Sequence, residues 1–351
     1  MDHTNVVSTM PWPAGSVTGI GSMPGTDPAE AAAIVVGELP NLPHLPELPA
    51  RGLGADVIGR TAGLLVDLAI EVVPSAYRVT ARPGVDHRRT IDLMQRDLDA
   101  FQEAIDRTAA APAAVKVQLA GPWTLAAGIE LPRGHRVLTD HGALREFTES
   151  LAEGLTRHVD EVARRTGRPV VVQLDEPSLP AVLAGALPTP SGLGTVAAVP
   201  APDARDLLAQ VVTAARTASS GPVIVHCCAP RPPVALFRAA GADAIALDAT
   251  LLDGVPAKLA DEIGESWDAG CVFLLGVIPS ADPERTPTLA EAAAPALRLV
   301  DRLGFPRTLL ADRAVATPVC GLAGATGTWA KNALRLLTDT GKAFVEPPES
   351  W

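Results

Sequence analysis

Short apolar runs alternate with longer helical stretches along this chain, and the alternation constrains its fold more than any other feature. The run 169–174 is typical of a buried parallel strand. The stretch 90–110 has helical periodicity, with Ile91, Met94, Leu98, Phe101 and Ile105 on one face. Repeated strand–helix units predict an α/β fold with a parallel sheet. About eight such units favour a closed (β/α)8 TIM barrel over an open doubly wound sheet.

The other elements are placed by the same kind of signal. Asp27 is positioned as the N-cap of a helix that Pro28 begins, and a long helical region is expected after Gly52. The proline-rich stretch 40–49 cannot be helical. Further strands are expected at 17–20, 115–119, 222–225, 244–247, 271–277 and 308–310.

The length of 351 residues fits one barrel, so residues 1–351 are predicted to form a single domain. Aromatic residues make up only 3% of the chain, although hydrophobic residues make up 47%. The core must therefore be built from Ala, Val, Leu and Ile, which suit parallel strands under helices. Residues 186–203 are rich in Gly, Pro and Ala and are expected to form a long loop over the barrel mouth.

The net charge of −11 argues against partners that need a basic surface, namely nucleic acid and anionic membranes. No apolar run approaches the ~20 residues of a spanning helix, and the N-terminus lacks the pattern of a signal peptide. A cytoplasmic location is expected. In that reducing compartment, cysteines are more often ligands or core residues than disulfides.

His226 and Cys228 end an apolar strand and are the first half of a candidate zinc site. Residues i and i+2 of a strand face the same side, so these two side chains converge while Cys227 faces away. Cys320 follows the last strand, and Asp248 ends a strand between them. In a barrel, such strand ends meet around one mouth. Two sulfurs, one nitrogen and one oxygen would be a plausible zinc shell.

Structural interpretations stand beside this one. His226 and Cys228 could be a buried histidine beside core cysteines, and Asp248 could cap the turn after its strand. Cys227 and Cys271 are expected in the core.

Other polar residues also lie at strand ends. Of the adjacent carboxylates Asp175 and Glu176, we expect one to bind a ligand and one to be structural. Glu47 could be a solvated charge in its proline-rich stretch. Ser22, among Gly19, Gly21 and Pro24, could end a strand or allow close approach of a ligand.

Five motifs, in order along almost the whole chain, resemble the catalytic C-terminal domain of cobalamin-independent methionine synthases. They are Ile20-Gly21-Ser22-Met23-Pro24, Gln173-Leu174-Asp175-Glu176-Pro177-Ser178-Leu179, His226-Cys227-Cys228, the strand that ends in Asp248, and Cys320-Gly321-Leu322.

The resemblance implies that zinc, held by His226, Cys228, Asp248 and Cys320, binds the thiol of homocysteine or a similar substrate. It also implies that Ile20 and Ser22 contact the backbone end of that substrate, and that Asp175 and Glu47 hold its amino group. The chemistry agrees, because only a thiolate is a good nucleophile and zinc deprotonates a bound thiol at neutral pH.

Three departures from the family concern the ligand set and the donor side. Asp248 stands where the family has a glutamate, and no histidine precedes Ile278-Pro279-Ser280, where the family has a proton donor. Gly128 takes the place of the folate-stacking tryptophan, from which Trp123 is displaced. The N-terminal half of full-length synthases also has no counterpart here. The thiol side is therefore kept and the methyltetrahydrofolate side lost, which implies a methylated corrinoid protein or another small electrophile as donor.

The sequence thus predicts a zinc-dependent methyltransferase that acts on a homocysteine-like thiol in methionine biosynthesis, and it assigns no general acid or base. Two alternatives stay open. A uroporphyrinogen decarboxylase-like enzyme would need arginines and no metal, and a non-catalytic protein would bind zinc and thiol without turnover.

Overall fold

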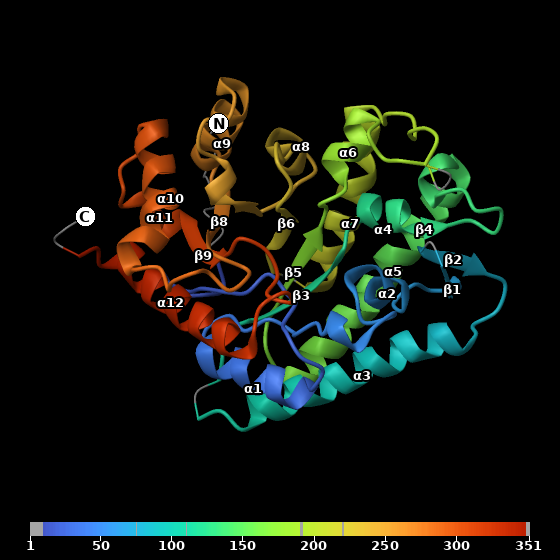
Figure 1. Cartoon of the computed structure of the whole chain (residues 1–351), viewed down its shortest axis with the longest axis horizontal. Coiled ribbons are helices and arrows are strands. Elements are labelled where there is room, and N and C mark those ends of the chain that lie inside the picture. The colour runs from blue at the N-terminus through green and yellow to red at the C-terminus, as the bar shows by residue number, and fades with distance from the viewer. Residues whose placement is uncertain (1–9, 75, 110, 190–191, 220, 349–351) are drawn as a thin grey trace, which may run out of the picture.

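A curved sheet of six parallel strands forms most of the barrel wall in the computed structural model, which describes residues 10–74, 76–109, 111–189, 192–219 and 221–348 (Figure 1). Each neighbouring pair is parallel and in order along the chain. The strands are β3 (Val115–Ala120), β5 (Val170–Asp175), β6 (Val223–Cys227), β7 (Ala244–Asp248), β8 (Val272–Ile278) and β9 (Ala314–Pro318).

Two short extended segments close this sheet into a barrel. Val17 bridges Ala316 of β9, and His44 bridges Lys116 of β3. The segments join each other where Ser22 bridges Glu47, and the Glu47 amide donates to the Gly21 carbonyl at 3.1 Å. Six strands and two bridging segments complete a closed (β/α)8 arrangement, which confirms the predicted fold class.

The helices are arranged around the sheet (Figure 1). Asp27 caps α1 as predicted, accepting from the amide of Ala29 at 2.9 Å. Within the described ranges, no helix is both long and apolar enough to cross a bilayer. The helices are α1 (Pro28–Glu38), α2 (Val57–Ala62), α3 (Val85–Asp106), α4 (Pro122–Gly128), α5 (His141–Thr166), α6 (Leu179–Ala184), α7 (Ala201–Ser219), α8 (Val234–Ala239), α9 (Ala257–Asp268), α10 (Leu289–Leu303), α11 (Leu309–Arg313) and α12 (Gly327–Val345), with 3-10 turns η1 (Pro49–Arg51), η2 (Val137–Thr139) and η3 (Ala249–Leu251).

The region after Gly52 is not the long helix that the sequence predicts. Only α2 is helical there, and an antiparallel hairpin of β1 (Ala69–Val73) and β2 (Ala76–Thr80) follows it. β2 also pairs with β4 (Ile129–Glu130) in a small second sheet. The β-branched residues of both strands favour this outcome over a helix.

Three smaller expectations also need correction. Residues 308–310 lead into α11 rather than a strand, and the final strand is β9, whose small side chains give only a weak strand signal. Ile91 is 38% exposed instead of lying on the buried face of α3. The loop predicted at 186–203 ends where α7 begins at Ala201, and its role as a cover of the mouth stays a prediction.

The barrel interior changes character from its N-terminal end to its mouth. At the N-terminal end, Trp12 plugs the interior against a layer of apolar side chains that includes Leu42, Val171, Val272 and Val315. Side chains two residues further along several strands are buried but polar, because alternate residues of a strand share a face. They are His44, Lys116, Gln118, Gln173, Asp175, His226 and Thr317.

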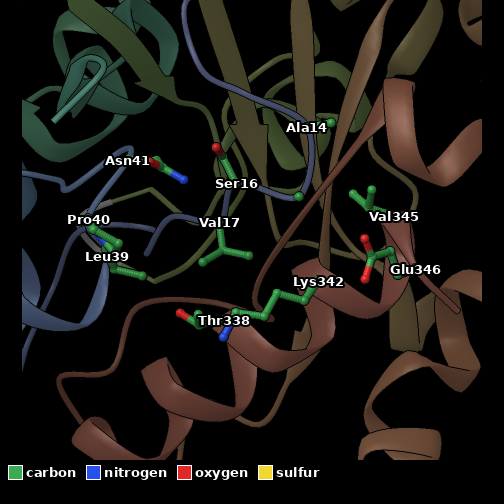
Figure 2. A pocket seen from close by; sticks show the side chains of 11 residues that line it. Ala14, Ser16, Val17, Leu39, Pro40, Asn41, Thr338, Lys342, Val345 and Glu346 are labelled. Carbon is green, nitrogen blue, oxygen red and sulfur yellow. The ribbon is translucent and has the colours of Figure 1, made fainter. Parts of the chain in front are cut away.

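A pocket of about 340 Å³ lies at this N-terminal end of the barrel, between the start of the first segment and the last turns of α12 (Figure 2). Its lining includes Ser16, Asn41, Lys342 and Glu346. Active sites of such barrels lie at the opposite face, at the C-terminal ends of the strands. The search for a functional site therefore starts at the mouth.

Trp12→Ala should lower the free energy of unfolding by about 3–5 kcal/mol, because it removes a large buried ring from a closed layer. Trp12 is 8% exposed. Chemical denaturation measures the change, and Leu193→Ala is the control because Leu193 is 93% exposed. A loss below about 1 kcal/mol would show that the plug does not stabilise the barrel.

Candidate functional site

Two thiols from distant parts of the chain meet at the mouth. The Sγ atoms of Cys228 and Cys320 lie 3.2 Å apart although the residues are 92 positions apart in sequence. Cys228 directly follows β6, and Cys320 comes two residues after β9 ends. A Cβ at Gly276, on the intervening strand β8, would lie 2.7 Å from Cα of Val319. The absence of a side chain there lets the chain before Cys320 fold closely over β8.

His226 lies beside these thiols with one ring nitrogen occupied and the other free. Strands β5 and β6 pair Asp175 with His226 in register. Their side chains meet at 2.7 Å between His226 Nδ1 and Asp175 Oδ1. His226 Nε2 is buried and has no hydrogen-bond partner among the described residues. A ring that donates through Nδ1 presents an unprotonated Nε2, which is the form that binds a metal.

The donor chemistry of this cluster fits zinc, while its present geometry is not that of a closed metal site. The described residues contain no group of three or more His, Cys, Asp and Glu side chains arranged to hold a metal ion. Two Zn–S bonds of about 2.3 Å at the tetrahedral angle separate the sulfurs by about 3.8 Å. The two thiols would therefore move apart by about half an ångström, and the orphaned Nε2 of His226 supplies a third donor.

Asp248, the predicted oxygen ligand, ends β7 at the mouth but caps the turn that follows it. Its Oδ1 accepts from the amide of Thr250 at 2.9 Å and from the Thr250 hydroxyl at 2.5 Å. This is the structural interpretation that the sequence left open. Metal binding by Asp248 remains a prediction and would compete with the cap for the same carboxylate.

The two paired thiols differ in their pKa values. Their mutual hydrogen bond lowers the pKa of Cys320 to about 6, and it raises the pKa of Cys228. Cys227 faces the other side of β6, as predicted, and joins the hydrophobic core. Burial raises the pKa of Cys227 to about 12, so that thiol stays protonated. Cys271 is also a core residue, 7% exposed.

The two short extended segments that close the barrel bring Ser22 and Glu47 together at the edge of the mouth, which we call the rim. The amide of Leu322 donates to the Ser22 carbonyl at 2.8 Å. A Cβ at Gly321 would lie 2.0 Å from Ser22 Oγ, so the serine hydroxyl sits directly against the residue after Cys320. Glu47 is buried at 5% exposure, which excludes the solvated charge that its proline-rich stretch allowed.

Burial raises the pKa of Glu47 to about 7, and the negative charge of Asp175 adds to the shift. The cations Arg60 and Lys116 act in the opposite direction. Two carboxylates thus face one rim, and a further cation between them would relieve their mutual repulsion. Such a pair suits an ammonium group.

Of the adjacent carboxylates Asp175 and Glu176, one is structural as predicted, and ligand binding by the other remains a prediction. Asp175 faces the mouth and holds His226, whereas Glu176 is fully buried and faces α4. Glu176 accepts from the amides of Trp123 at 3.0 Å and Thr124 at 2.8 Å. It therefore satisfies the free amides at the start of α4.

Sequence reasoning missed the polar residues beneath the rim. Lys116 is fully buried, and its Nζ donates to Gln173 Oε1 at 2.7 Å and to the Ile20 carbonyl at 2.9 Å. Gln173 Nε2 also donates to the Ile20 carbonyl at 2.9 Å, so both lone pairs of that oxygen are occupied. A contact of Ile20 with substrate would have to use another of its atoms. The available signal was a lysine flanked by valines within an apolar strand.

The closed barrel and the thiol–imidazole cluster at its mouth define a TIM-barrel protein with its site at the C-terminal strand ends. Residues 16–343 match the family described as cobalamin-independent synthase, catalytic domain, and the chain belongs to that family. It is thus related to methyltransferase catalytic domains, as its motifs predict.

Two solved structures share this fold. One is a B12-independent methionine synthase from Shewanella sp. W3-18-1 in complex with selenomethionine, with a TM-score of 0.61 and 12% identity, covering 95% of this chain and 98% of that one. The other is a methyltransferase from Methanosarcina mazei, with a TM-score of 0.56 and 14% identity, covering 96% and 94%. No curated protein sequence matches the chain.

Asp248→Ala should lower the free energy of unfolding by about 1 kcal/mol, because the amide of Thr250 loses its acceptor. Asp248→Asn keeps an acceptor oxygen and should stay within about 0.3 kcal/mol of wild type. Urea denaturation of both variants measures the difference. Equal destabilisation by the two would mean that the charge of Asp248, not its cap, stabilises the turn.

Proposed function

We propose that this protein is a zinc-dependent thiol alkyltransferase and that methylation of homocysteine, or of a similar small amino-acid thiol, is its reaction. The observation that carries this proposal is the 3.2 Å contact between Cys228 and Cys320 beside the free Nε2 of His226. Family membership supports it, because the family is that of the cobalamin-independent synthase catalytic domain.

His226, Cys228 and Cys320 would hold the zinc, and Asp248, which now caps Thr250, would compete with the substrate thiol for the fourth position. Bound zinc lowers the pKa of a coordinated thiol, so that the substrate is a thiolate at neutral pH. Asp175 holds the imidazole of His226 in the tautomer that leaves Nε2 free. In the transfer itself, the thiolate sulfur bonds to the alkyl carbon while the donor–carbon bond breaks and its electron pair stays on the donor.

The amino-acid end of the substrate would lie between the first segments and β5. Asp175 and Glu47 offer two carboxylates to its ammonium group, and the Ser22 hydroxyl, beside Gly321, faces its carboxylate. Placing the ammonium between two carboxylates relieves their mutual repulsion. The site therefore favours a zwitterionic thiol over a simple alkyl thiol.

The donor would differ from the folate of the methionine synthases. Trp123 is 1% exposed and its Nε1 donates to the Ala204 carbonyl at 2.9 Å, so its ring is unavailable for stacking on a donor. A Cβ at Gly128 would lie 2.9 Å from Cδ1 of Ile58, so an aromatic side chain there would require Ile58 to move. The strand before Ile278 is apolar and buried along its length. A methylated corrinoid protein or another small electrophile remains the proposed donor class.

Zinc content tests the ligand set. Cys228→Ser and Cys320→Ser should lose both zinc and homocysteine binding, because each removes one of the paired sulfurs. Cys227→Ala is the matched control and should keep both, since its thiol faces the core. Asp248→Asn, which preserves the cap, should lower the zinc affinity without abolishing it. Metal analysis and calorimetry on the purified variants give both quantities.

The outcomes separate the proposal from its alternatives. Wild-type protein without stoichiometric zinc would contradict it and would favour a metal-free, decarboxylase-like activity. Zinc and homocysteine binding without methylation by any of a methylcobalamin-loaded corrinoid protein, free methylcobalamin or a simple methyl electrophile would favour a non-catalytic binding protein.

Methionine binding should become tighter as pH rises, because Glu47 must ionise to hold the ammonium group. With a pKa of about 7, its ionised fraction rises roughly tenfold between pH 6 and pH 8. Methionine has no thiol, so its dissociation constant, measured by calorimetry, reports the amino-acid end alone. We expect about five- to tenfold tighter binding at pH 8.

Glu47→Gln is the control for this pH dependence and should flatten it. Burial also lowers the pKa of Lys116 to about 7, so Lys116 titrates in the same range. Glu47→Gln leaves that titration in place, so the part of the pH dependence that the variant loses comes from Glu47. An unchanged pH profile in Glu47→Gln would rule out Glu47 as the group that binds the ammonium.

A further inference from the structure

Lys116 occupies an unusual position for an ammonium group, inside the barrel and away from solvent. Its exposure is 0%. Its Nζ has three acceptors, one for each proton: Gln173 Oε1 at 2.7 Å, the Ile20 carbonyl at 2.9 Å and Gln118 Oε1 at 3.3 Å. A buried ammonium is tolerated only when it is hydrogen-bonded and has a counter-charge nearby. Asp175 and Glu47 provide that charge.

The lysine determines which way the amide of Gln173 points. An ammonium can only donate, so the amide oxygen must face Lys116. The amide nitrogen then faces the opposite side, where it donates to Asp175 Oδ1 at 2.7 Å and to the Ile20 carbonyl at 2.9 Å. Gln173 is itself 0% exposed, so water cannot substitute for either partner.

Asp175 connects the oriented amide of Gln173 to the ring of His226. Its Oδ1 accepts from Gln173 Nε2 and lies 2.7 Å from His226 Nδ1. With the carboxylate held in place, Nδ1 is the protonated nitrogen and Nε2 is the free one. The four residues Lys116, Gln173, Asp175 and His226 form one continuous chain of hydrogen bonds from β3 through β5 to β6, which we call the orienting chain.

We propose that Lys116 is a positioning residue of the thiol site, which acts through Gln173 and Asp175 to fix the tautomer and direction of His226. This rests on the proposed function for its role in metal binding, but the tautomer itself can be observed without metal. Lys116 also offsets charge, because one ammonium against the two carboxylates of Asp175 and Glu47 leaves the rim one positive charge short of neutrality. The ammonium of an amino-acid substrate supplies that missing positive charge, which adds a reason for the site to select zwitterionic thiols.

Nitrogen-15 NMR of the histidine side chains in the full-length, metal-free protein tests the orienting chain directly. Wild type should show His226 as a single tautomer with Nδ1 protonated, its signals assigned by their loss in His226→Gln. Lys116→Met and Gln173→Glu should both lose this single tautomer. Gln173→Glu has nearly the same shape and keeps an acceptor for Lys116, but it cannot donate to Asp175. It therefore remains informative even if Lys116→Met fails to fold.

Zinc affinity, measured by competition with a chelator, gives the second readout. Both variants should bind zinc about 10- to 100-fold more weakly, the usual effect of losing support behind a ligand. Lys258→Met is the control, because Lys258 lies on α9 with its side chain 88% exposed, and it should change neither readout.

The two hypotheses fail in different ways. If His226 keeps the single Nδ1-protonated tautomer in both variants, Lys116 is not a positioning residue, whatever happens to zinc. If the variants lose the tautomer but wild type binds no zinc, the orienting chain stands and the proposed function is wrong. A purely structural Lys116 would lower the melting temperature of Lys116→Met and leave the tautomer in Gln173→Glu unchanged.

Discussion

The hydrogen bond between Asp175 and His226 connects the two halves of the site. It joins His226, which lies next to the paired thiols of Cys228 and Cys320, to Asp175, whose charge acts on Glu47. The bond exists because β5 and β6 pair in register at these two residues. A shift of either strand by one residue would turn its own side chain away from that of its neighbour, since alternate residues of a strand face opposite sides. The register of two parallel strands therefore determines whether a site can form.

The sequence predicts the barrel well where its strands are continuous and buried on both faces. β3, β5, β6, β7 and β8 are mostly apolar, and the motifs at the ends of several of them identify the mouth. The first two segments are harder to recognise, because they join the sheet through single bridges and one of them is rich in proline. The hairpin of β1 and β2 and the true position of β9 depend on tertiary pairing, which local patterns do not encode.

In the candidate site, too, the sequence predicts what local patterns determine and misses what depends on pairing between strands. Alternation along β6 and the position of Cys320 after the last strand were enough to predict that Cys228 and Cys320 meet. The cap that Asp248 forms on Thr250 is local, and it was one of the two interpretations that the sequence left open. The burial of Lys116 beneath the rim depends on interactions between strands and could not be read from the chain. A lysine in an apolar strand has no meaning until its partners on neighbouring strands are known.

The rim draws on both extremes of the chain, and this has a consequence for biosynthesis. Ser22 belongs to the first barrel segment and lies against Gly321, and Val17 of that segment bridges β9. A ribosome delivers β9 last among these strands, so until β9 emerges the polypeptide holds an open sheet that ends at β8 and carries Cys228 without its partner Cys320. Until then, the sheet edge that β9 will cover, and the first segment that will bridge to it, both lack their partners. The pairing of Cys228 with Cys320 would then form only in polypeptides whose barrel has already closed.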